Sequence, residues 1–385
     1  MLFRSSTSPV SLTRVGIVGG GQLARMMAEA ASSLGLTVTV LDPTPACPAH
    51  EFAAQIEGEF DDAAKLVELA QVSEVVTLDI EAVNAAGLAA LEHNGVNVAP
   101  SSTVLGIIQD KLRQKEFLRE HQLPTADFQA LGSARARDLA AFGLPCVVKA
   151  RRHGYDGRGV KVVRTLADLA DLPNGPCLVE HKVEIAKELA VMVARNWQGE
   201  IATYPVVEAD FDPRANILDV IRAPAAISAE VAAHCRTLAE TLVTRLEGIG
   251  IFGIEFFLDT AGRVLINEIS PRPHNSGHYT IEACATSQFA QHLRAVTGMP
   301  LGSTALLHPA ASFNLLGEPD ATGVPAYTGL DAATIAGAAI HLYGKQQVQP
   351  FRKMGHITVT GVSVEAAMKT ANELRRIVKV RGSPA

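Results

Sequence analysis

Two apolar segments of the chain each carry one glutamate, and a three-residue turn separates them. Segments 251–259 (IFGIEFFLD) and 263–270 (RVLINEIS) have the composition of strands, and the intervening TAG predicts a hairpin turn. Such a hairpin allows Glu255 and Glu268 to face each other across one ladder. Burying a carboxylate among apolar side chains costs free energy unless the charge is paired or bound to a metal. Any fold of this chain must therefore bring positive charge to this hairpin.

The chemistry of these residues favours magnesium as the source of that charge. Two carboxylates together with nucleotide phosphates form the hard oxygen set that Mg²⁺ prefers. Asn267, beside Glu268, adds a neutral oxygen. The alternative is a buried glutamate paired with an arginine or a lysine, and the neighbouring amide favours the metal over this pairing. We therefore predict Glu255 and Glu268 as metal ligands.

The first hundred residues alternate strand-like and helix-like segments. Val15–Val18 and Thr37–Leu41 predict strands, and Gln22–Ser33 predicts an amphipathic helix between them. The same rhythm continues with a helix over 61–70, a strand over 75–77 and a helix over 84–93. This alternation is typical of an open parallel α/β sheet, whose ligands bind at the carboxyl edge of the strands.

A glycine-rich turn follows the first predicted strand. Gly19, Gly21 and Ala24 fit the G-x-G-x-x-G/A pattern of dinucleotide-binding turns, and Asp42 follows the second strand where a ribose-binding acid would lie. However, Pro43 comes directly after Asp42, and DPTPACPAH indicates a loop. The motif alone is a weak signal, so we do not predict a nicotinamide-dependent dehydrogenase. We expect the glycines to form a tight turn at a ligand-binding edge.

From about Ser101 the pattern changes to short strands separated by glycine. A charged amphipathic helix is predicted to end at Pro124, and a longer helix is predicted over Ser228–Leu246. Another helix, Tyr279–Val296, is expected to close the region that contains the hairpin. The last 80 residues predict a small mixed β/α unit. The short strands are predicted over 145–150, 159–163, 176–181 and 188–195.

A lysine and a glycine-rich basic loop follow one of these strands. Lys149 ends PCVVK, and RRHGYDGRGV (151–160) comes next. Small residues let backbone N–H groups approach an anion, and arginines add positive charge. A plain surface hairpin has the same composition, but the position directly after Lys149 favours a flexible flap over phosphates. Glu180 and Glu188 end and begin further strands, where they either bind adenine and ribose or form an ordinary exposed pair.

A stiff polar segment follows the predicted metal strand. In SPRPHNSGH, Arg272 and His274 lie between or beside prolines, directly after Glu268 and its strand. A lone histidine in such a turn is more often structural. The crowding of polar groups beside Glu268 favours function instead, and predicts a site for an anionic second substrate.

Composition limits the partners of the chain. The formal net charge of −6 leaves no basic surface for nucleic acid, so phosphate-bearing ligands must be held by local groups. The five cysteines are scattered and predict buried free thiols in a reducing compartment. No apolar stretch is long enough to span a bilayer, and the start lacks the apolar core of a signal peptide. We expect a cytoplasmic protein that binds neither membrane nor nucleic acid.

Taken in order, these features resemble the ATP-grasp superfamily. Four stretches, GGGQLARMM, GYDGRG, EISPRPHNSGHYTIEA and RKMGHITV, are similar to the 5-(carboxyamino)imidazole ribonucleotide synthetase family of purine biosynthesis. The resemblance covers nearly the whole chain from about Arg14. It is most specific over Asn267–Ala283 and Lys353–His356.

The resemblance implies an α/β fold in three parts. These are an N-terminal open parallel α/β (pre-ATP-grasp) domain, a two-lobed α+β ATP-grasp core and a small C-terminal β/α domain. We expect them over residues 14–105, 106–305 and 306–385, with a lid lobe at about 125–190 and a disordered extension over 1–13. The resemblance also implies a homodimer.

The implied activity is that of an ATP-dependent ligase. ATP phosphorylates bicarbonate to carboxyphosphate, and the amine of 5-aminoimidazole ribonucleotide captures the carboxyl group, directly or through carbon dioxide. The implied cofactors are ATP and Mg²⁺, with two ions expected and Mn²⁺ as a substitute. Because carboxyphosphate hydrolyses quickly, a lid that excludes water is needed, and the glycine flap is the natural candidate.

The resemblance carries specific roles onto residues of this chain. Implied ATP contacts are Lys111, Lys149, Gly154, Tyr155, Asp156, Gly157, Arg158, Gly159, Val160, Glu180, His181, Lys182, Val183, Glu188, Phe211, Asn267 and Glu268. Implied ribonucleotide or bicarbonate contacts are Gln22, Glu81, Tyr155, Arg158, Arg272, His274, Arg352 and Lys353. Implied catalytic residues are Arg272, Lys353, Asp156 and His274, and the implied metal ligands are Glu255 and Glu268.

The chain departs from the family pattern at three positions. Asp79 and Ala82, in LDIEAV, replace residues of an aromatic-Glu-aromatic-Glu-Asn run, so only Glu81 is carried over. Phe211 stands where relatives often place a histidine. Two rival functions remain at this point: a formate-dependent glycinamide ribonucleotide transformylase, which shares the PRPH turn, and a non-catalytic nucleotide-binding scaffold. HNSGHYTIEA and KMGH favour the carboxylating enzyme, and the presence of Lys149, Glu255 and Glu268 argues against the scaffold.

Overall fold

The structure is a computed structural model that describes residues 13–152, 159–212 and 217–383. The expected disordered extension over 1–13 lies outside the described residues, apart from Thr13. Most of the predicted flap also lies outside them, namely Gly154, Tyr155, Asp156, Gly157 and Arg158.

The N-terminal region forms the predicted open parallel sheet. Its strands lie in the order β3-β2-β1-β4-β5, and every neighbouring pair is parallel. The edge strand β3 was not predicted, because its sequence AQIE lacks an apolar run. The strands are β1 (Arg14–Val18), β2 (Thr37–Asp42), β3 (Ala54–Glu57), β4 (Val75–Leu78) and β5 (Asn97–Val98). The helices are α1 (Gln22–Ser33), α2 (Ala63–Gln71), α3 (Ala85–His93), α4 (Ser102–Ile108) and α5 (Lys111–Glu120).

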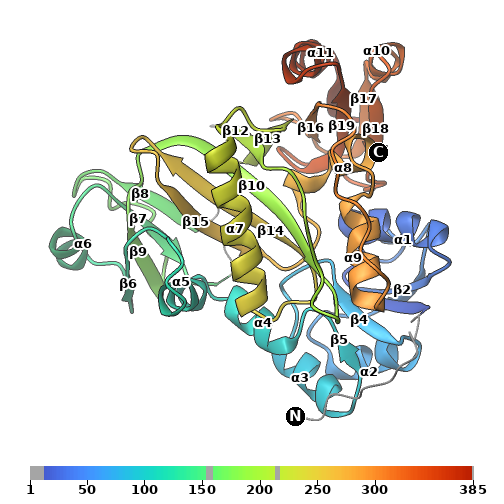
Figure 1. Cartoon of the computed structure of the whole chain (residues 1–385), viewed down its shortest axis with the longest axis horizontal. Helices are drawn as coiled ribbons and strands as arrows, with labels where there is room; N and C mark the ends of the chain where they lie inside the picture. Colours follow the sequence, from blue (N-terminus) through green and yellow to red (C-terminus); the bar gives the residue numbers. More distant parts are fainter. Residues whose placement is uncertain (1–12, 153–158, 213–216, 384–385) are drawn as a thin grey trace.

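A small antiparallel sheet follows in the order β6-β9-β7-β8 and forms the lobe at the left of Figure 1. Helix α6 (Ala136–Phe142) covers it, and Leu139 packs there with Val148 and Val179 in a separate apolar cluster. A lobe with its own core can move as a unit relative to the rest of the molecule. Its strands are β6 (Phe128–Leu131), β7 (Cys146–Ala150), β8 (Val160–Val163) and β9 (Cys177–His181).

A large sheet forms the centre of the molecule (Figure 1). Its strands run in the order β15-β14-β10-β12-β13-β16-β19-β18, and β11 pairs with β10. Helix α7 (Ala229–Arg245) packs on β10, β14 and β15 through Leu238, Leu242 and Val243. The strands are β10 (Ile185–Arg195), β11 (Ile201–Thr203), β12 (Val207–Asp212), β13 (Ile217–Ala223), β14 (Gly250–Asp259), β15 (Val264–Ser270), β16 (Ala310–Leu316), β18 (Ala339–Leu342) and β19 (Lys353–Thr360).

The prediction of one helix over Tyr279–Val296 is wrong. A 3₁₀ turn, η1 (Asn275–Gly277), leads into the short helix α8 (Thr280–Ala283), and α9 (Gln288–Thr297) begins after a break. Cys284 is extended there and bridges to Leu306. The Ser287 hydroxyl then caps α9 by accepting from the Ala290 N–H, so a serine inside the apolar pattern starts a new helix.

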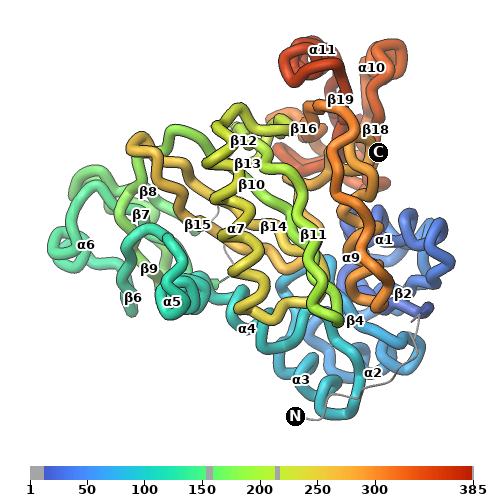
Figure 2. Tube along the Cα trace, viewed as in Figure 1, coloured from blue at the N-terminus to red at the C-terminus, as the bar shows by residue number. Residues whose placement is uncertain are grey.

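Helix α9 joins the N-terminal sheet to the large sheet. It lies beside α1 and also packs on β14, as Figure 2 shows. Phe289 and Leu293 of α9 belong to the same buried apolar cluster as Leu23 and Met27 of α1. A shared core of this kind fixes the carboxyl edge of the N-terminal sheet relative to the hairpin β14–β15.

The C-terminal residues form the predicted mixed β/α unit, but part of it extends the large sheet. Strand β16 pairs with β13, and β19 and β18 follow outward. A separate two-stranded ladder, β17 (Val324–Thr328) with β20 (Lys379–Ser383), and helices α10 (Leu330–Ile335) and α11 (Val364–Ile377) complete it. The start of β19 is thereby anchored to the central sheet.

Two expectations from composition can be compared with the structure. All five cysteines lie among the described residues, where each is buried with a free thiol, as predicted. Within residues 13–152, 159–212 and 217–383, no helix combines the length and apolar character needed to cross a bilayer.

Candidate active site

The two predicted carboxylates meet on the central hairpin. Glu255 of β14 and Glu268 of β15 are direct register partners, which places their side chains on one face of the ladder. The register shifts immediately after this pair, because Phe256 pairs with Ile266 and leaves Asn267 as the extra residue. This bulge turns the Asn267 amide toward the pair, and its Nδ2 lies 3.4 Å from Glu255 Oε2.

The two carboxylates of the pair have different charged neighbours. Lys111 Nζ, from the first turn of α5, forms an ion pair with Glu268 Oε1. Burial opposes ionisation of Glu268, but Lys111 and then Lys149 hold the pKa of its carboxyl below the usual range. Burial, followed by the charges of Glu268 and Glu188, raises the pKa of Glu255 to about 7. Lys111 thus forms an ion pair with Glu268, whereas at Glu255 burial and the neighbouring carboxylates outweigh the charge of Lys111.

The residues present fit a divalent cation. In the described parts of the chain, no set of three or more His, Cys, Asp and Glu side chains is arranged to hold a metal ion by itself. Two protein carboxylates with phosphate oxygens as further ligands is the usual way in which Mg²⁺ is held beside a nucleotide. The raised pKa of Glu255 supports this assignment, because an added cation would relieve the repulsion that raises it.

A second buried carboxylate orients two lysines. Glu180 of β9 is 3% exposed, and its Oε2 lies 2.6 Å from Lys149 Nζ while its Oε1 lies 3.0 Å from Lys115 Nζ. Although burial opposes ionisation, the two lysines lower the pKa of Glu180 to about 2. Lys149 also donates to Asn267 Oδ1 at 3.2 Å, which ties the lobe formed by β6–β9 to the hairpin.

Lys115 is a site residue that the sequence reasoning missed. It lies four residues after Lys111 on α5, so both lysines occupy one face of the helix and point toward the hairpin. Burial lowers its pKa to about 8, and its Nζ donates to Thr125 Oγ1 at 2.6 Å. The i, i+4 spacing of the two lysines was the signal that would have found it.

The remaining predicted ATP contacts surround the same place. Glu188 of β10, Phe211 of β12 and Glu255 line one small cavity. Burial and the charge of Asp210 raise the pKa of Glu188 to about 7. At the far end of the flap, the Gly159 carbonyl accepts from the Ala150 N–H. Val160 is the register partner of Lys149.

The end of β9 and the residues after it make contacts of their own. His181 stacks on the ring of Phe142, with centroids 4.3 Å apart, and Lys182 pairs with Glu184 at 2.8 Å. Val183 is half-buried in the connection to β10. Their implied roles toward ATP stay predictions, as does that of Glu180, whose described polar contacts are with lysines.

The N-terminal sheet contributes a second group of residues. Arg272, two residues after β15, has its Nη2 2.9 Å from Glu81 Oε1, at the carboxyl edge of β4. His274 Nε2 lies 3.6 Å from Glu255 Oε1, and His274 Nδ1 lies 2.8 Å from Ser276 Oγ. The polar turn after β15 therefore touches both the carboxylate pair and the edge of the parallel sheet.

The glycine turn that opens α1 is held by carboxylates. Asp42 Oδ2 accepts from the Gly20 N–H at 2.8 Å, and Asp79 Oδ2 accepts from the Gly21 N–H at 2.6 Å. A Cβ on Gly20 would lie 2.3 Å from Cys47 Sγ, so the turn requires glycine there. Asp42 is thus a structural ligand of the turn, in agreement with the decision against a dehydrogenase. Burial raises the pKa of Asp79 to about 6.

The C-terminal unit brings a buried lysine to the same region. Lys353 begins β19 and is 9% exposed. Arg272, His274 and Lys353 all lie close enough to His278 to lower its pKa through their positive charge, in addition to burial. Arg352 is held in its own loop, where Nη1 donates to the Gln347 carbonyl at 2.8 Å. Gln22 lies at the first position of α1.

Three family models match consecutive parts of the chain. Residues 12–109 match the ribonucleotide synthetase preATP-grasp domain, and residues 116–289 match the ATP-grasp domain. Residues 310–370 match the phosphoribosylaminoimidazole carboxylase C-terminal domain.

Full-length relatives agree with this order. The N5-carboxyaminoimidazole ribonucleotide synthase of Synechococcus elongatus is 40% identical over 98% of this chain and 98% of its own length. The chain belongs to the N5-carboxyaminoimidazole ribonucleotide synthase family. These enzymes are ATP-grasp ligases of purine biosynthesis, so the resemblance noted in the sequence is confirmed, and neither the formate-dependent transformylase nor the non-catalytic scaffold is supported.

Solved structures of this family have the same fold. The N5-carboxyaminoimidazole ribonucleotide synthetase of Thermotoga maritima superimposes with a TM-score of 0.90 at 45% identity, covering 96% of this chain and 100% of that chain. The Aspergillus clavatus enzyme, solved with ADP and 5-aminoimidazole ribonucleotide, gives a TM-score of 0.86 at 34% identity, covering 95% of this chain and 98% of that chain.

The raised pKa of Glu255 predicts how its removal changes stability. Glu255→Gln is expected to raise the midpoint of thermal unfolding of the ligand-free protein at pH 8 by about 2–4 °C. A carboxyl whose pKa is raised on folding destabilises the folded state increasingly as the pH rises from 4.5 to about 7, and not below 4.5. The gain should therefore disappear at pH 4.5.

Thermal melts of both proteins across this pH range test the expectation. The exposed Glu373→Gln on α11 is the matched control and should shift the midpoint by less than 1 °C at either pH. A midpoint for Glu255→Gln at pH 8 that is unchanged or lower than that of the wild type would contradict the charge imbalance described above.

Proposed function

We propose that this chain carboxylates 5-aminoimidazole ribonucleotide. ATP transfers its γ-phosphoryl group to bicarbonate, giving ADP and carboxyphosphate. The ribonucleotide amine then takes the carboxyl group, directly or after release of carbon dioxide, and the products are N5-carboxyaminoimidazole ribonucleotide and phosphate. The observation that carries the proposal is the position of Glu255 and Glu268, with Lys111 and Lys149 on one side and Arg272 and His274 on the other.

The lysine side of the hairpin is proposed to bind the nucleotide. Lys111 and Lys149, held by Glu268 and Glu180 respectively, present positive charge to the ATP phosphates. Phosphoryl transfer needs positioning and charge neutralisation more than a covalent nucleophile. Glu255 and Glu268 would hold Mg²⁺, which when bound neutralises phosphate charge. On nucleotide binding, Lys111 would exchange its partner, leaving Glu268 for a phosphate oxygen.

The lysine side of the hairpin would also bind the adenine base and the ribose of ATP. Glu188 is proposed to accept from the ribose hydroxyls, and the Val183 backbone to contact adenine. The larger set of proposed ATP contacts is completed by Gly154, Tyr155, Asp156, Gly157, Arg158, Gly159, Val160, Glu180, His181, Lys182, Phe211 and Asn267. The flap among them would exclude water from carboxyphosphate.

The arginine side is proposed to bind the other two substrates. Arg272 would orient bicarbonate and then the carboxyphosphate oxygens, because a guanidinium matches a planar carboxyl group. Glu81, its present partner, would accept from the ribonucleotide amine, which would free Arg272 for the anion. His274 and Asp156 would act at the reacting groups. Lys353, Arg352, Gln22, Tyr155 and Arg158 would surround the ribonucleotide.

The proposal also includes the oligomeric state, the location, the domain bounds and the metal content of the protein. We propose a cytoplasmic homodimer whose domains span residues 14–105, 106–305 and 306–385. Two Mg²⁺ ions, or Mn²⁺ in their place, are proposed for each active site.

Labelled substrates test the reaction. With ATP, Mg²⁺ and 5-aminoimidazole ribonucleotide, phosphate release should require bicarbonate, and label from bicarbonate should appear in the ribonucleotide product. Formate with glycinamide ribonucleotide should give no product. Label transfer from formate, or phosphate release that is independent of the ribonucleotide, would overturn the proposal.

Removing a proposed metal ligand should abolish turnover. Glu268→Gln is expected to reduce phosphate release at least 100-fold, because it removes both a hard oxygen ligand and the partner of Lys111. Its circular dichroism spectrum should match that of the wild type. The exposed Glu373→Gln on α11 is the matched control for a glutamate-to-glutamine substitution. Near-normal turnover of Glu268→Gln would refute the metal role.

Removing the buried lysine Lys353 should weaken the binding of the ribonucleotide much more than the binding of ATP. Lys353→Met is expected to raise the KM for the ribonucleotide at least tenfold and to change the KM for ATP by less than twofold. Steady-state kinetics with each substrate varied in turn measures both, and the exposed Lys369→Met on α11 is the matched control. An unchanged KM for the ribonucleotide would count against the assigned role.

A further inference from the structure

Three histidines from two parts of the chain form a stack beside the proposed active site. His278 lies just after the turn η1, and His356 and His341 lie on β19 and β18. The ring centroids of His278 and His356 are 4.6 Å apart at 26°, and those of His356 and His341 are 4.4 Å apart at 14°. We call these three rings the imidazole column.

Hydrogen bonds define the state of the inner ring. Gln288 Oε1 accepts from the His274 N–H at 2.9 Å, and Gln288 Nε2 donates to the His274 carbonyl at 2.8 Å. These two bonds fix the orientation of the amide, so its Nε2, which lies 3.1 Å from His278 Nδ1, must donate there as well. His278 Nδ1 is therefore an acceptor, and the ring is neutral with its proton on Nε2.

The surroundings also require a neutral ring. Burial, together with the positive charges of His274, His341, Lys353 and Arg272, holds the pKa of His278 well below its usual range. The pKa of His356 is lowered by burial, His278 and His341. His278 thus stands among positively charged groups without adding to their charge.

The column contacts the start of β19 as well as the turn after β15. The Tyr343 hydroxyl lies 3.0 Å from His356 Nδ1. The Tyr343 N–H donates to the Met354 carbonyl at 3.0 Å, and Lys345 Nζ donates to the Lys353 carbonyl at 2.8 Å. His278, at one end of the column, is thereby bonded through Gln288 to the segment that carries His274, and the central ring, His356, lies on β19, the strand that Lys353 begins.

Burying imidazole rings at these two positions costs free energy that phenyl rings would not cost. His278 and His356 are each 1% exposed, and the Nε2 atom of each has no hydrogen-bond partner among the described residues. A buried polar atom without a partner is destabilising, whereas a phenylalanine would fill the same space and stack equally well. The gain that offsets this cost must come from the bonds at Nδ1.

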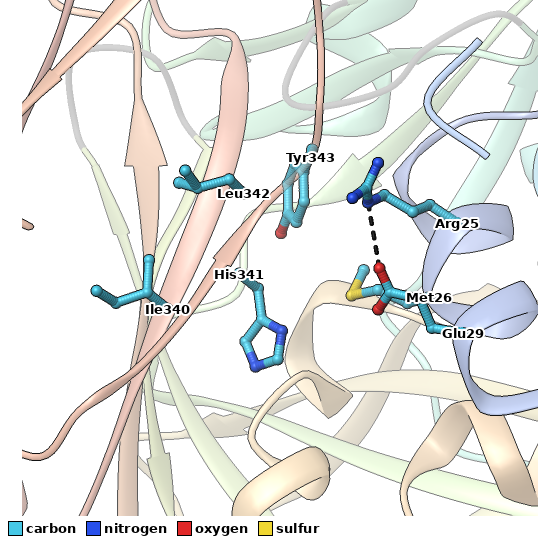
Figure 3. A pocket seen from close by; sticks show the side chains of 7 residues that line it. All are labelled: Arg25, Met26, Glu29, Ile340, His341, Leu342 and Tyr343. Atoms are coloured by element: carbon cyan, nitrogen blue, oxygen red, sulfur yellow. Dashed lines mark ion pairs between the residues drawn. The ribbon is translucent and has the colours of Figure 1, made fainter. Parts of the chain in front are cut away.

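The outer end of the column opens on a cavity. His341 Nε2 lies 2.6 Å from Glu282 Oε1, and the ring borders a cavity of about 310 Å³ between β18 and α1 (Figure 3). On the opposite wall, Arg25 pairs with Glu29 at 3.2 Å. The column is therefore held in place by its own hydrogen bonds rather than by close packing at this end.

We infer that His278 and His356 are positioning residues for the carboxylation reaction. Through Gln288 and Tyr343 they set the distance between His274, beside the metal carboxylates, and Lys353, beside the ribonucleotide. This inference rests on the proposed function. It requires the hydrogen bonds at Nδ1 of each ring and not merely two aromatic rings.

Two substitutions at one position separate these requirements. His278→Phe keeps a ring in the column but removes the acceptor for Gln288, and is expected to lower kcat/KM for the ribonucleotide at least tenfold with the KM for ATP changed less than twofold. His278→Asn removes the ring but places an amide oxygen near Nδ1, and is expected to stay within threefold of the wild type. The exposed His234→Phe on α7 is the matched control.

A third variant covers failure of the first to fold. Tyr343→Phe removes one hydroxyl from a buried ring and is expected to lower the same kcat/KM at least threefold. Wild-type behaviour of His278→Phe, equal losses in His278→Phe and His278→Asn, or an unchanged kcat/KM in Tyr343→Phe would each overturn the inference. Absence of ribonucleotide-dependent turnover in the wild type would instead overturn the proposed function.

Discussion

Repulsion between two carboxylates on one hairpin is the constraint on which the rest of the structure depends. Glu255 and Glu268 face each other in a ladder of mostly apolar residues; among the described residues a lysine pairs with Glu268, whereas the ion-pair partner of Glu255 is His274 at 3.6 Å. Such an arrangement is stable only if cations gather around it. Other parts of the fold supply positive and hydrogen-bonding groups: α5 brings Lys111, the lobe formed by β6–β9 brings Lys149, and the turn after β15 brings His274 to 3.6 Å from Glu255.

Two ion pairs of the structure involve side chains that we propose to meet substrates. Lys111 pairs with a carboxylate that would hold the metal, and Arg272 pairs with Glu81, which would meet the ribonucleotide. Binding would exchange each internal pair for a pair with a substrate, so the protein avoids exposing isolated charges in either state. The same exchange would couple two of the substrate sites, because the ribonucleotide, by taking Glu81, would release Arg272 for the carboxyl anion.

The sequence predicted most of the fold, for identifiable reasons. Helix α1 and the hairpin β14–β15 have strong periodicity and clear turns, and both were predicted within one or two residues. Strand β3 was missed because it has no apolar pattern, and the break before α9 was missed because one serine cap outweighs a continuous apolar stripe. The spacing of Lys115 from Lys111 is a local signal, but its contact with Glu180, like the imidazole column, joins distant segments, which no local pattern records.

A crystal structure with ADP and Mg²⁺ tests the central interaction most directly. If the hairpin carboxylates are the metal site, the ion will be coordinated by Glu255 and Glu268, and Lys111 Nζ will have moved from Glu268 to a phosphate oxygen. An ion bound elsewhere, with the pair between Lys111 and Glu268 intact and Glu255 turned away from the nucleotide, would contradict this account.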